Sequence, residues 1–416
     1  MVRALHSILL YSFPFAPQIG GLEHLTERTA RALCRRGLSV TVVTDTRQAF
    51  AEDDELSFPF QILRKPSIGR LWSAVRAADV VQMNGFDVQV FALAQFARRP
   101  VVWQHIDYDT VDPRGICSTH GRSCNFSLQR CWSCLRRDHS RRAASQALAA
   151  FFAKVVASRI VEVNLVASRY ASDRLRLPRM VHLMLGIDTG RFTPGPSPEW
   201  SGTLRLLFNA RHTPAKGCDV LLQAIAECRR RGFRVEATIA GDGPHRLASE
   251  CLAESLAIGD LVEFVGFIPE DGLIERMRSA DAVVVPSTND EYYGLSAAEA
   301  LACGTPVLAS DAGGLPEVTG AGGVLFPSGN VGLLADVAIM LARDAGIRKR
   351  LRIEARAHAL RTLREDAMID GYIAIYKRVT GEMRSSERDG SRLTRPESGP
   401  GPERAAGARD EGGQDH

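Results

Sequence analysis

The sequence predicts an α/β protein with two doubly wound domains, each a parallel sheet under helical cover, that face each other across a cleft. Both halves of the chain alternate short apolar segments with helical ones, as parallel strand-helix-strand units do. The apolar segments of the second half are hydrophobic almost throughout, which is typical of strands covered on both faces. A length of 416 residues accommodates two domains of ordinary size.

The predicted N-terminal domain covers residues 1–190. Its first strand is HSILLYSF, and the following helix is GGLEHLTERTARALCRRG, whose apolar residues recur at helical spacing and which ends at a glycine. Further strands are expected at LSVTVVT, ADVVQMN, PVVWQH and EVNLVAS, with a helix at SQALAAFFAKVVAS before the last of them.

A segment rich in proline and glycine at residues 191–202 is expected to link the two domains. The C-terminal domain then covers residues 203–362, with strands at LRLLFNA, RVEATIA, LVEFVG, DAVVVP, TPVLAS and GGVLF. We expect a helix at residues 363–380 that packs back on the N-terminal domain. Residues 381–416 are rich in charge, glycine and proline and bury too little apolar surface to fold, so this tail is expected to be disordered.

Composition narrows the classes of partner. The chain is 45% hydrophobic and 24% charged, which is typical of a soluble globular protein. A formal net charge of +4 is small for this length and does not favour a nucleic-acid partner. No apolar run approaches the roughly 20 residues of a membrane span. We therefore expect a cytoplasmic protein, with contact at the inner face of the membrane left open.

The strongest functional signal is the segment DEYYGLSAAEALACGTPVLASDAGGLPE. A helix is expected to begin near Gly294, so the amides around Leu295 and Ser296 are unpaired and form an anion site. Glu291 lies in the loop before this helix, and Glu299 lies about a turn and a half inside it. Carboxylates beside a phosphate site suit the paired hydroxyls of a sugar and a ribose. The alternative is a surface helix with two solvated acids.

Two loops add to this signal. In RLLFNARHTPAKGCDVLLQAI, Arg211 and Lys216 follow a strand, and two cations on one such loop suit a diphosphate; an ordinary exposed basic loop is the alternative. In PQIGGLEHL, Gly20 and Gly21 allow a ligand to approach the backbone closely. Their spacing is not G-x-G-x-x-G, which disfavours a nicotinamide dehydrogenase.

Taken together, these segments resemble family 4 of the retaining glycosyltransferases, the glycosyl transferases group 1 type, which has the two-domain GT-B fold. The resemblance rests on GGLEHLTERTARALCRRGLSVTVV, NARHTPAKGCDVLLQAI, GDGP, VEFVGFIP and PSTNDEYYGLSAAEALACGTPVLASDAGGLPEV. It covers about residues 7–380 and is more specific in the second domain than in the first.

The resemblance implies a nucleotide-diphosphate-sugar donor held mainly by the second domain. Carried over by position, Arg211 and Lys216 grip the diphosphate. Glu291 faces the donor sugar, Glu299 binds the ribose, and Gly21 approaches the phosphates from the other domain.

Four further positions bear on the first domain and its loops. His105 in VVWQHIDYDT matches a histidine that the family places near the donor sugar, although a lone histidine after a strand is often structural. Asp107 and Asp109 imitate the Asp-x-Asp metal motif of the other major glycosyltransferase fold. The resemblance implies no metal cofactor for catalysis, since cationic side chains and helix dipoles neutralise the leaving diphosphate. Leu185 in MLGID replaces the usual asparagine.

A cysteine-rich insertion is expected at residues 114–142. Its four cysteines follow the pattern C-x6-C-x6-C-x2-C and suit one tetrahedral structural zinc ion; they are Cys117, Cys124, Cys131 and Cys134. An iron–sulfur cluster fits the ligand count as well, and a set of reduced cysteines is the third alternative. The insertion is rich in arginine, which indicates either a solvated face or a seat for an anionic acceptor or an acidic lipid surface.

From these features we predict a hexosyl-type, retaining glycosyltransferase that moves a sugar from a nucleotide-diphosphate donor to an acceptor hydroxyl. The acceptor is a glycan, a lipid-linked molecule or a small molecule. Two alternatives remain: a GT-B sugar-nucleotide epimerase, and a catalytically silent nucleotide-sugar-binding or scaffold protein. The joint presence of two cations and two carboxylates in one domain disfavours the silent protein.

Overall fold

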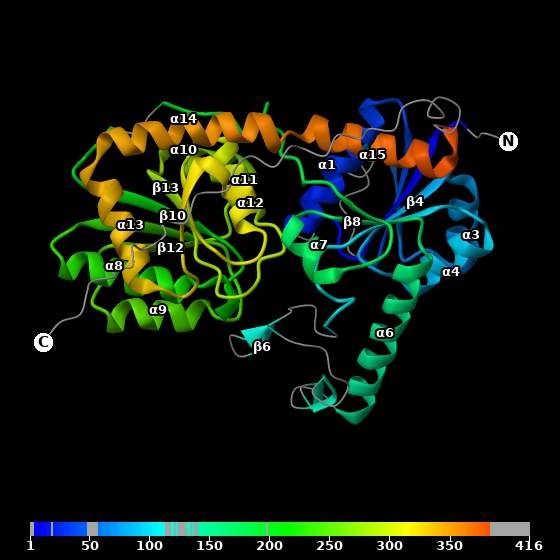
Figure 1. Ribbon diagram of the computed structural model, residues 1–416, viewed down its shortest axis with the longest axis horizontal. Coiled ribbons are helices and arrows are strands. Elements are labelled where there is room, and N and C mark those ends of the chain that lie inside the picture. Colours follow the sequence, from blue (N-terminus) through cyan, green and yellow to red (C-terminus); the bar gives the residue numbers. More distant parts are fainter. Residues whose placement is uncertain are drawn as a thin grey trace, which may run out of the picture.

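The computed structural model confirms the α/β class and the two parallel sheets (Figure 1). It describes residues 4–17, 20–47, 57–112, 118–119, 122–123, 131–133, 135–136, 140–196 and 199–382. The predicted disordered tail lies outside these residues, apart from its first two positions.

The first domain contains a seven-stranded sheet in the order β3-β2-β1-β4-β5-β8-β9, with every neighbouring pair parallel. Its strands are β1 (Ser7–Ser12), β2 (Ser39–Thr44), β3 (Gln61–Arg64), β4 (Val80–Asn84), β5 (Val101–Gln104), β8 (Val163–Val166) and β9 (Met180–His182). Its helices are α1 (Gly21–Arg35), α3 (Ile68–Ala77), α4 (Val88–Phe96), α6 (Arg141–Ile160) and α7 (Arg169–Leu175). A separate antiparallel pair joins β6 (Ser118–Thr119) and β7 (Arg122–Ser123).

The second domain contains a six-stranded parallel sheet in the order β12-β11-β10-β13-β14-β15. Its strands are β10 (Leu204–Asn209), β11 (Val235–Ala240), β12 (Val262–Gly266), β13 (Ala282–Val285), β14 (Val307–Ser310) and β15 (Gly323–Phe326). Its helices are η1 (Pro214–Lys216), α8 (Cys218–Arg230), α9 (Arg246–Ser255), α10 (Glu270–Ser279), α11 (Leu295–Ala302), α12 (Leu315–Thr319), η2 (Gly320–Gly322), α13 (Val331–Arg343) and α14 (Ala345–Thr362).

Alternate residues of the second sheet face two different apolar layers. Leu206 and Phe208 of β10 pack with residues of α8 and α13, whereas Leu207 packs with residues of α10, α11 and α14. Helices on both faces explain why these strands are apolar at nearly every position. Because both faces are covered, ligands reach this domain at the ends of its strands.

The last helix, α15 (Glu365–Thr380), returns to the first domain, where it lies along α1 in Figure 1. The hydroxyl of Tyr372 donates to Gln104 Oε1 at 3.2 Å, and the hydroxyl of Tyr376 donates to Gln82. All four of these side chains are buried, so α15 is bonded to the interior of the first domain.

The chain therefore crosses between the domains twice, and the two crossings are bonded to each other. The amide of Ile187 donates to the carbonyl of Leu363 at 2.7 Å, and the amide of Glu365 donates to the carbonyl of Ile187 at 3.0 Å. This double crossing joins the second domain to the first, and further contacts between the domains are made by α1 and α7.

Candidate active site

A cavity of about 190 Å³ lies where loops of the two domains meet. The first domain contributes Asp107 and Tyr108, which follow β5, and the second domain contributes loops that follow β10 and β13. Its remaining lining residues are Ala215, Lys216, Asn289, Asp290, Glu291 and Tyr292. Ligands of doubly wound sheets bind beyond the carboxyl ends of the strands, and this cavity lies there for both sheets.

Lys216 and Glu291, predicted for different parts of the donor, are bonded to each other. Lys216 Nζ donates to both carboxylate oxygens of Glu291, at 2.9 and 2.7 Å, and the hydroxyl of Ser287 donates to the same carboxylate at 2.9 Å. Both side chains retain exposed surface, 34% for Lys216 and 16% for Glu291. A cation and a carboxylate are thus fixed side by side at the cavity wall.

The loop that carries Lys216 depends on the glycine after it. Gly217 has φ = 72°, and a Cβ there would lie 1.9 Å from the carbonyl oxygen of Pro286. Any side chain would therefore push the loop away from the end of β13. Arg211, on the same loop, is exposed.

The start of α11 lies as the sequence predicts, with Gly294 directly before Leu295. The hydroxyl of Ser296 donates to the carbonyl of Asn209 at 2.7 Å, so this side chain ties the first turn of α11 to the end of β10. The amides of the first turn remain the part of the helix that can bind an anion.

The first domain approaches this helix start through its own glycines. Gly20 directly precedes α1, and a Cβ on Gly21 would lie 2.7 Å from Leu295 Cδ1. The beginnings of α1 and α11 are therefore in contact across the domain boundary.

Glu299 is placed differently from Glu291. Its side chain is 15% exposed, about as much as that of Glu291, but its cation comes from the other domain: Arg28 of α1 lies 3.8 Å away, measured from Nη2 to Oε1. Burial raises the pKa of Glu299 to about 7, against the lowering effect of Arg28. Arg28 is not among the predicted site residues, because it lies on a helix of the other domain and its approach to Glu299 depends on how the two domains pack.

His105 is buried at the end of β5, and its protonation follows from its neighbours. Its Nε2 lies 2.9 Å from Asn164 Oδ1, while Asn164 Nδ2 donates to the carbonyls of Ser158 and Pro178 at 2.8 and 2.7 Å. Since the amide nitrogen is used twice, the oxygen faces the imidazole and Nε2 carries the proton. Burial lowers the pKa of His105, so the ring is neutral at pH 7. Within the described chain, Nδ1 has no hydrogen-bond partner.

The Asp-x-Asp segment is already engaged with a protein cation. Lys154 Nζ lies 2.6 Å from Asp109 Oδ2, and the amide of Asp109 donates to Asp107 Oδ1 at 2.9 Å. Burial, with the charge of Asp109, raises the pKa of Asp107 to about 7. Asp107 therefore lines the cavity as a carboxyl group that changes charge near neutral pH.

Leu185 and the four cysteines of the insertion remain to be placed. Leu185 is buried, and its carbonyl accepts a hydrogen bond from the hydroxyl of Tyr293 at 2.6 Å. Of the predicted zinc ligands, Cys131 is buried, and Cys117, Cys124 and Cys134 lie outside the described residues. In the parts of the chain that are described, no three His, Cys, Asp or Glu side chains lie together as a metal site.

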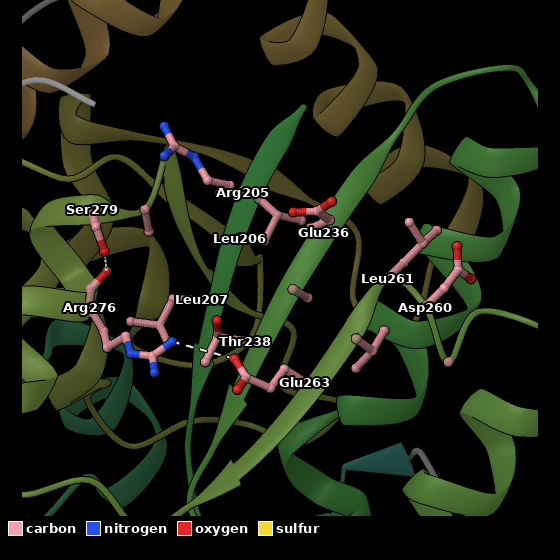
Figure 2. A pocket seen from close by; sticks show the side chains of 14 residues that line it. Arg205, Leu206, Leu207, Glu236, Thr238, Asp260, Leu261, Glu263, Arg276 and Ser279 are labelled. Atoms are coloured by element: carbon pink, nitrogen blue, oxygen red, sulfur yellow. Dashed lines mark hydrogen bonds and ion pairs between the residues drawn. The ribbon is translucent and has the colours of Figure 1, made fainter. Parts of the chain in front are cut away.

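A larger cavity, of about 470 Å³, lies elsewhere in the second domain (Figure 2). It includes Arg205, Glu236 and Thr238 of β10 and β11, and Figure 2 shows Arg276 directed toward Glu263 across it. These two side chains form an ion pair at 3.5 Å, and Arg205 pairs with Asp281 at 3.4 Å. None of the predicted donor residues lines this cavity, so the interdomain cavity is the candidate site.

Comparison with known proteins agrees with this geometry. Residues 196–358 match the family described as glycosyl transferases group 1. A D-inositol 3-phosphate glycosyltransferase of Segniliparus rotundus is 29% identical, over 90% of this chain and 89% of that protein. One from Actinosynnema mirum is 35% identical over 54% of this chain and 57% of that protein, so the chain spans little more than half the length of that relative.

Solved structures show the same architecture. Anabaena Alr3699/HepE in complex with UDP and glucose has a TM-score of 0.67 and 19% identity, and the match covers 88% of this chain and 98% of that one. Sucrose-phosphate synthase (tll1590) from Thermosynechococcus elongatus has a TM-score of 0.69 and 19% identity, covering 91% and 100%. The architecture is therefore the GT-B fold of glycosyltransferases. Within this architecture, the match to the glycosyl transferases group 1 covers residues 196–358, most of the second domain.

The described helices were also compared with the requirements of a bilayer span. None of them combines the length and the apolar character needed to cross a membrane.

Proposed function

We propose that the protein is a retaining glycosyltransferase that moves a hexose-type sugar from a nucleotide diphosphate to an acceptor hydroxyl. The observation that carries this proposal is the Lys216–Glu291 pair at a cavity that both domains line. A cation for phosphate and a carboxylate for sugar hydroxyls lie in direct contact there. A nucleotide sugar presents both chemical groups next to each other.

The charges that the reaction develops match the charges of the cavity wall. In the transfer, the bond between the anomeric carbon and the diphosphate oxygen breaks, and a bond to the acceptor oxygen forms. The acceptor proton passes to a departing phosphate oxygen. Lys216, Arg211 and the first amides of α11 are the groups that would stabilise the leaving diphosphate. Retention at the anomeric carbon follows from the resemblance to family 4.

Glu299 would bind the ribose, since it lies about one turn along α11 from the amides that face the phosphates. Gly21 would let the backbone of α1 approach the donor at the start of that helix. The structural neighbour Anabaena Alr3699/HepE, solved with UDP and glucose and with UDP-glucose, supports a nucleotide sugar as the donor class.

The acceptor would enter from the side of the first domain, where Asp107 and Tyr108 line the cavity. The neutral ring of His105, with an unpaired Nδ1 acceptor, lies at the end of the same strand and would serve a sugar hydroxyl. A glycan, a lipid-linked molecule and a small polyol all offer the hydroxyl that the reaction requires.

The cysteine-rich insertion at residues 114–142 would form the remaining part of the acceptor-binding site. We propose that Cys117, Cys124, Cys131 and Cys134 hold one structural zinc ion, on the strength of their spacing in the sequence. The arginines around them would then face an anionic acceptor or the inner surface of a membrane, which fits a cytoplasmic enzyme.

Product analysis tests the function against its alternatives. The purified protein is first screened with UDP-, GDP- and ADP-sugars by thermal shift, since a ligand of the native state raises the melting temperature. The nucleotide sugar that stabilises it is then incubated with and without a mixture of polyol and glycan acceptors. Release of nucleotide diphosphate that increases with acceptor, together with a new glycoside, supports transfer. An isomerised sugar nucleotide would indicate an epimerase, and binding without turnover a silent binding protein.

A further inference from the structure

We propose that Arg28, on α1 of the first domain, is a positioning residue for the donor site of the second domain and acts through the carboxylate of Glu299. This inference rests on the proposed function, in which Glu299 binds the ribose of the donor. Arg28 lies in the segment GGLEHLTERTARALCRRGLSVTVV, but the resemblance gives it no role.

The contact crosses the domain boundary. Arg28 Nη2 and Glu299 Oε1 are 3.8 Å apart, and the two side chains are only 14% and 15% exposed. The helices that carry them start side by side, because Gly21 of α1 contacts Leu295 of α11. The ion pair therefore lies further along the same helix contact that forms the phosphate end of the site.

Arg28 has little else to balance its charge. Its Nε, Nη1 and Nη2 atoms are all buried and have no hydrogen-bond partner in the described structure. The ring of Phe192 lies 5.8 Å from the guanidinium carbon. Glu365 is also near, but its carboxylate accepts from Arg35 at 2.9 Å. A buried guanidinium without hydrogen bonds is costly, and such residues are found where another function requires them.

The geometry leaves Glu299 able to bind a ligand. A carboxylate has about four lone-pair positions, and an ion pair at 3.8 Å occupies none of them as a hydrogen bond does. Two ribose hydroxyls can therefore donate to Glu299 while Arg28 balances its charge. In contrast, Lys216 is bonded directly to both oxygens of Glu291.

Arg28 affects the site through the protonation of Glu299. The groups that act on this carboxyl are Arg28 from α1, which favours its charged form, and Glu270 from α10, which disfavours it. The thiol of Cys303, one turn further along, has a pKa raised by burial to about 12 and stays neutral in the working range. Without Arg28, the carboxyl group would be protonated at neutral pH and would be a weaker acceptor for hydroxyls.

Titration of the full-length protein with nucleoside diphosphates tests this role. UDP, GDP and ADP are first measured on the wild type at pH 7, and the one that binds is then titrated between pH 6 and 9. We expect Arg28→Met to weaken nucleotide binding about tenfold at pH 7. A protonated Glu299 no longer forms a charge-assisted hydrogen bond with the ribose hydroxyls, and this loss has about that size. The pH at which binding strengthens should also move upward, since more alkali is needed to ionise Glu299. Arg28→Lys should restore part of the affinity.

Two controls separate this effect from misfolding. Arg31→Met lies one turn along α1, where Arg31 pairs with Glu27 and packs on Phe58 within the first domain, and it should bind as the wild type does. Glu299→Gln should bind weakly and with a smaller pH dependence near 7 than the wild type, since Asp107 still titrates in the cavity. If the wild type binds a nucleotide and Arg28→Met binds it equally well or more tightly, Arg28 does not position the site and the inference is overturned. If the wild type binds none of the three nucleotides, the proposed function fails as well.

Discussion

The two carboxylates of the E-x7-E segment are eight residues apart, and the cations beside them come from different domains. Glu291 lies in a loop, and its cation, Lys216, comes from the same domain and contacts it directly. Glu299 lies in a helix, is more enclosed by the first domain, and has a cation from that domain at 3.8 Å. The second domain alone therefore positions the carboxylate of Glu291, whereas the surroundings of Glu299 depend on how the two domains pack against each other.

This difference has a chemical consequence. The carboxylate of Glu291 is held in direct contact with the ammonium group of Lys216. Glu299 has a pKa near 7 because of burial, so its charge depends on pH and on Arg28. We therefore expect substitutions around Glu291 and around Glu299 to differ in how much binding or turnover is lost, in the pH dependence of that loss and in the ligand whose binding is weakened.

The largest expected effect is at Lys216. Lys216→Met removes the ammonium group that would stabilise the leaving diphosphate, and loss of one such contact costs about 2.7–4 kcal/mol, or a factor of about 10²–10³ in kcat. Steady-state transfer assays measure this loss. Lys349→Met, on the exposed surface of α14, is the matched control and should transfer at the wild-type rate. Turnover near the wild-type value in Lys216→Met would contradict the role of Lys216.

A stability effect is expected where α15 enters the first domain. Tyr376→Phe leaves the buried oxygen of Gln82 without its donor, which should lower the free energy of unfolding by about 1–3 kcal/mol. Urea denaturation measures the change. The affinity of the folded variant for the donor should be unaffected, because neither Tyr376 nor Gln82 lines the interdomain cavity. A loss of nucleotide affinity without a loss of stability would place Tyr376 in the site instead.

A moderate effect is expected from pH. In the folded protein the pKa of Glu299 is raised above its ordinary value, so the protein gains a carboxylate at this position only as the pH rises through about 7. Nucleotide affinity should therefore increase from pH 6 to pH 8 in the wild type and in Glu291→Gln. Isothermal titration at several pH values is the measurement. An affinity that is flat across this range would show that Glu299 is ionised throughout.

The smallest effect is expected from chelators. Lysine, arginine and helix amides supply the positive charge for the diphosphate, so brief EDTA treatment should leave transfer almost unchanged. Elemental analysis should find about one zinc per chain, retained through purification, and less in Cys131→Ser. Activity that is lost with EDTA and restored by magnesium or manganese would instead assign catalysis to a metal at Asp107 and Asp109.

Much of the fold could be predicted because its strands are long apolar runs. All six strands of the second domain, β10–β15, were expected from such runs, and the structure contains them. The strands β3 and β9 were missed, since each lies at a sheet edge, is three or four residues long and is partly exposed. Edge strands need fewer apolar residues, so their sequence gives little signal.

The site was predictable only where its residues share one loop or one helix. The segment from Glu291 to Glu299 and the loop from Arg211 to Lys216 carry local patterns. The direct bond between Lys216 and Glu291 depends on two loops that meet in space, and the approach of Arg28 depends on the packing of one domain against the other. Neither distance is encoded in spacing along the chain.

The most direct test of the account compares two ligands in two variants. The binding of the nucleoside diphosphate and of its sugar conjugate is measured by isothermal titration for Glu299→Gln and for Glu291→Gln. If Glu299 binds the ribose and Glu291 the sugar, Glu299→Gln weakens both ligands, whereas Glu291→Gln weakens only the sugar conjugate. Equal weakening of the two ligands by Glu291→Gln, or unchanged binding of both by Glu299→Gln, would contradict the division of roles between the two carboxylates.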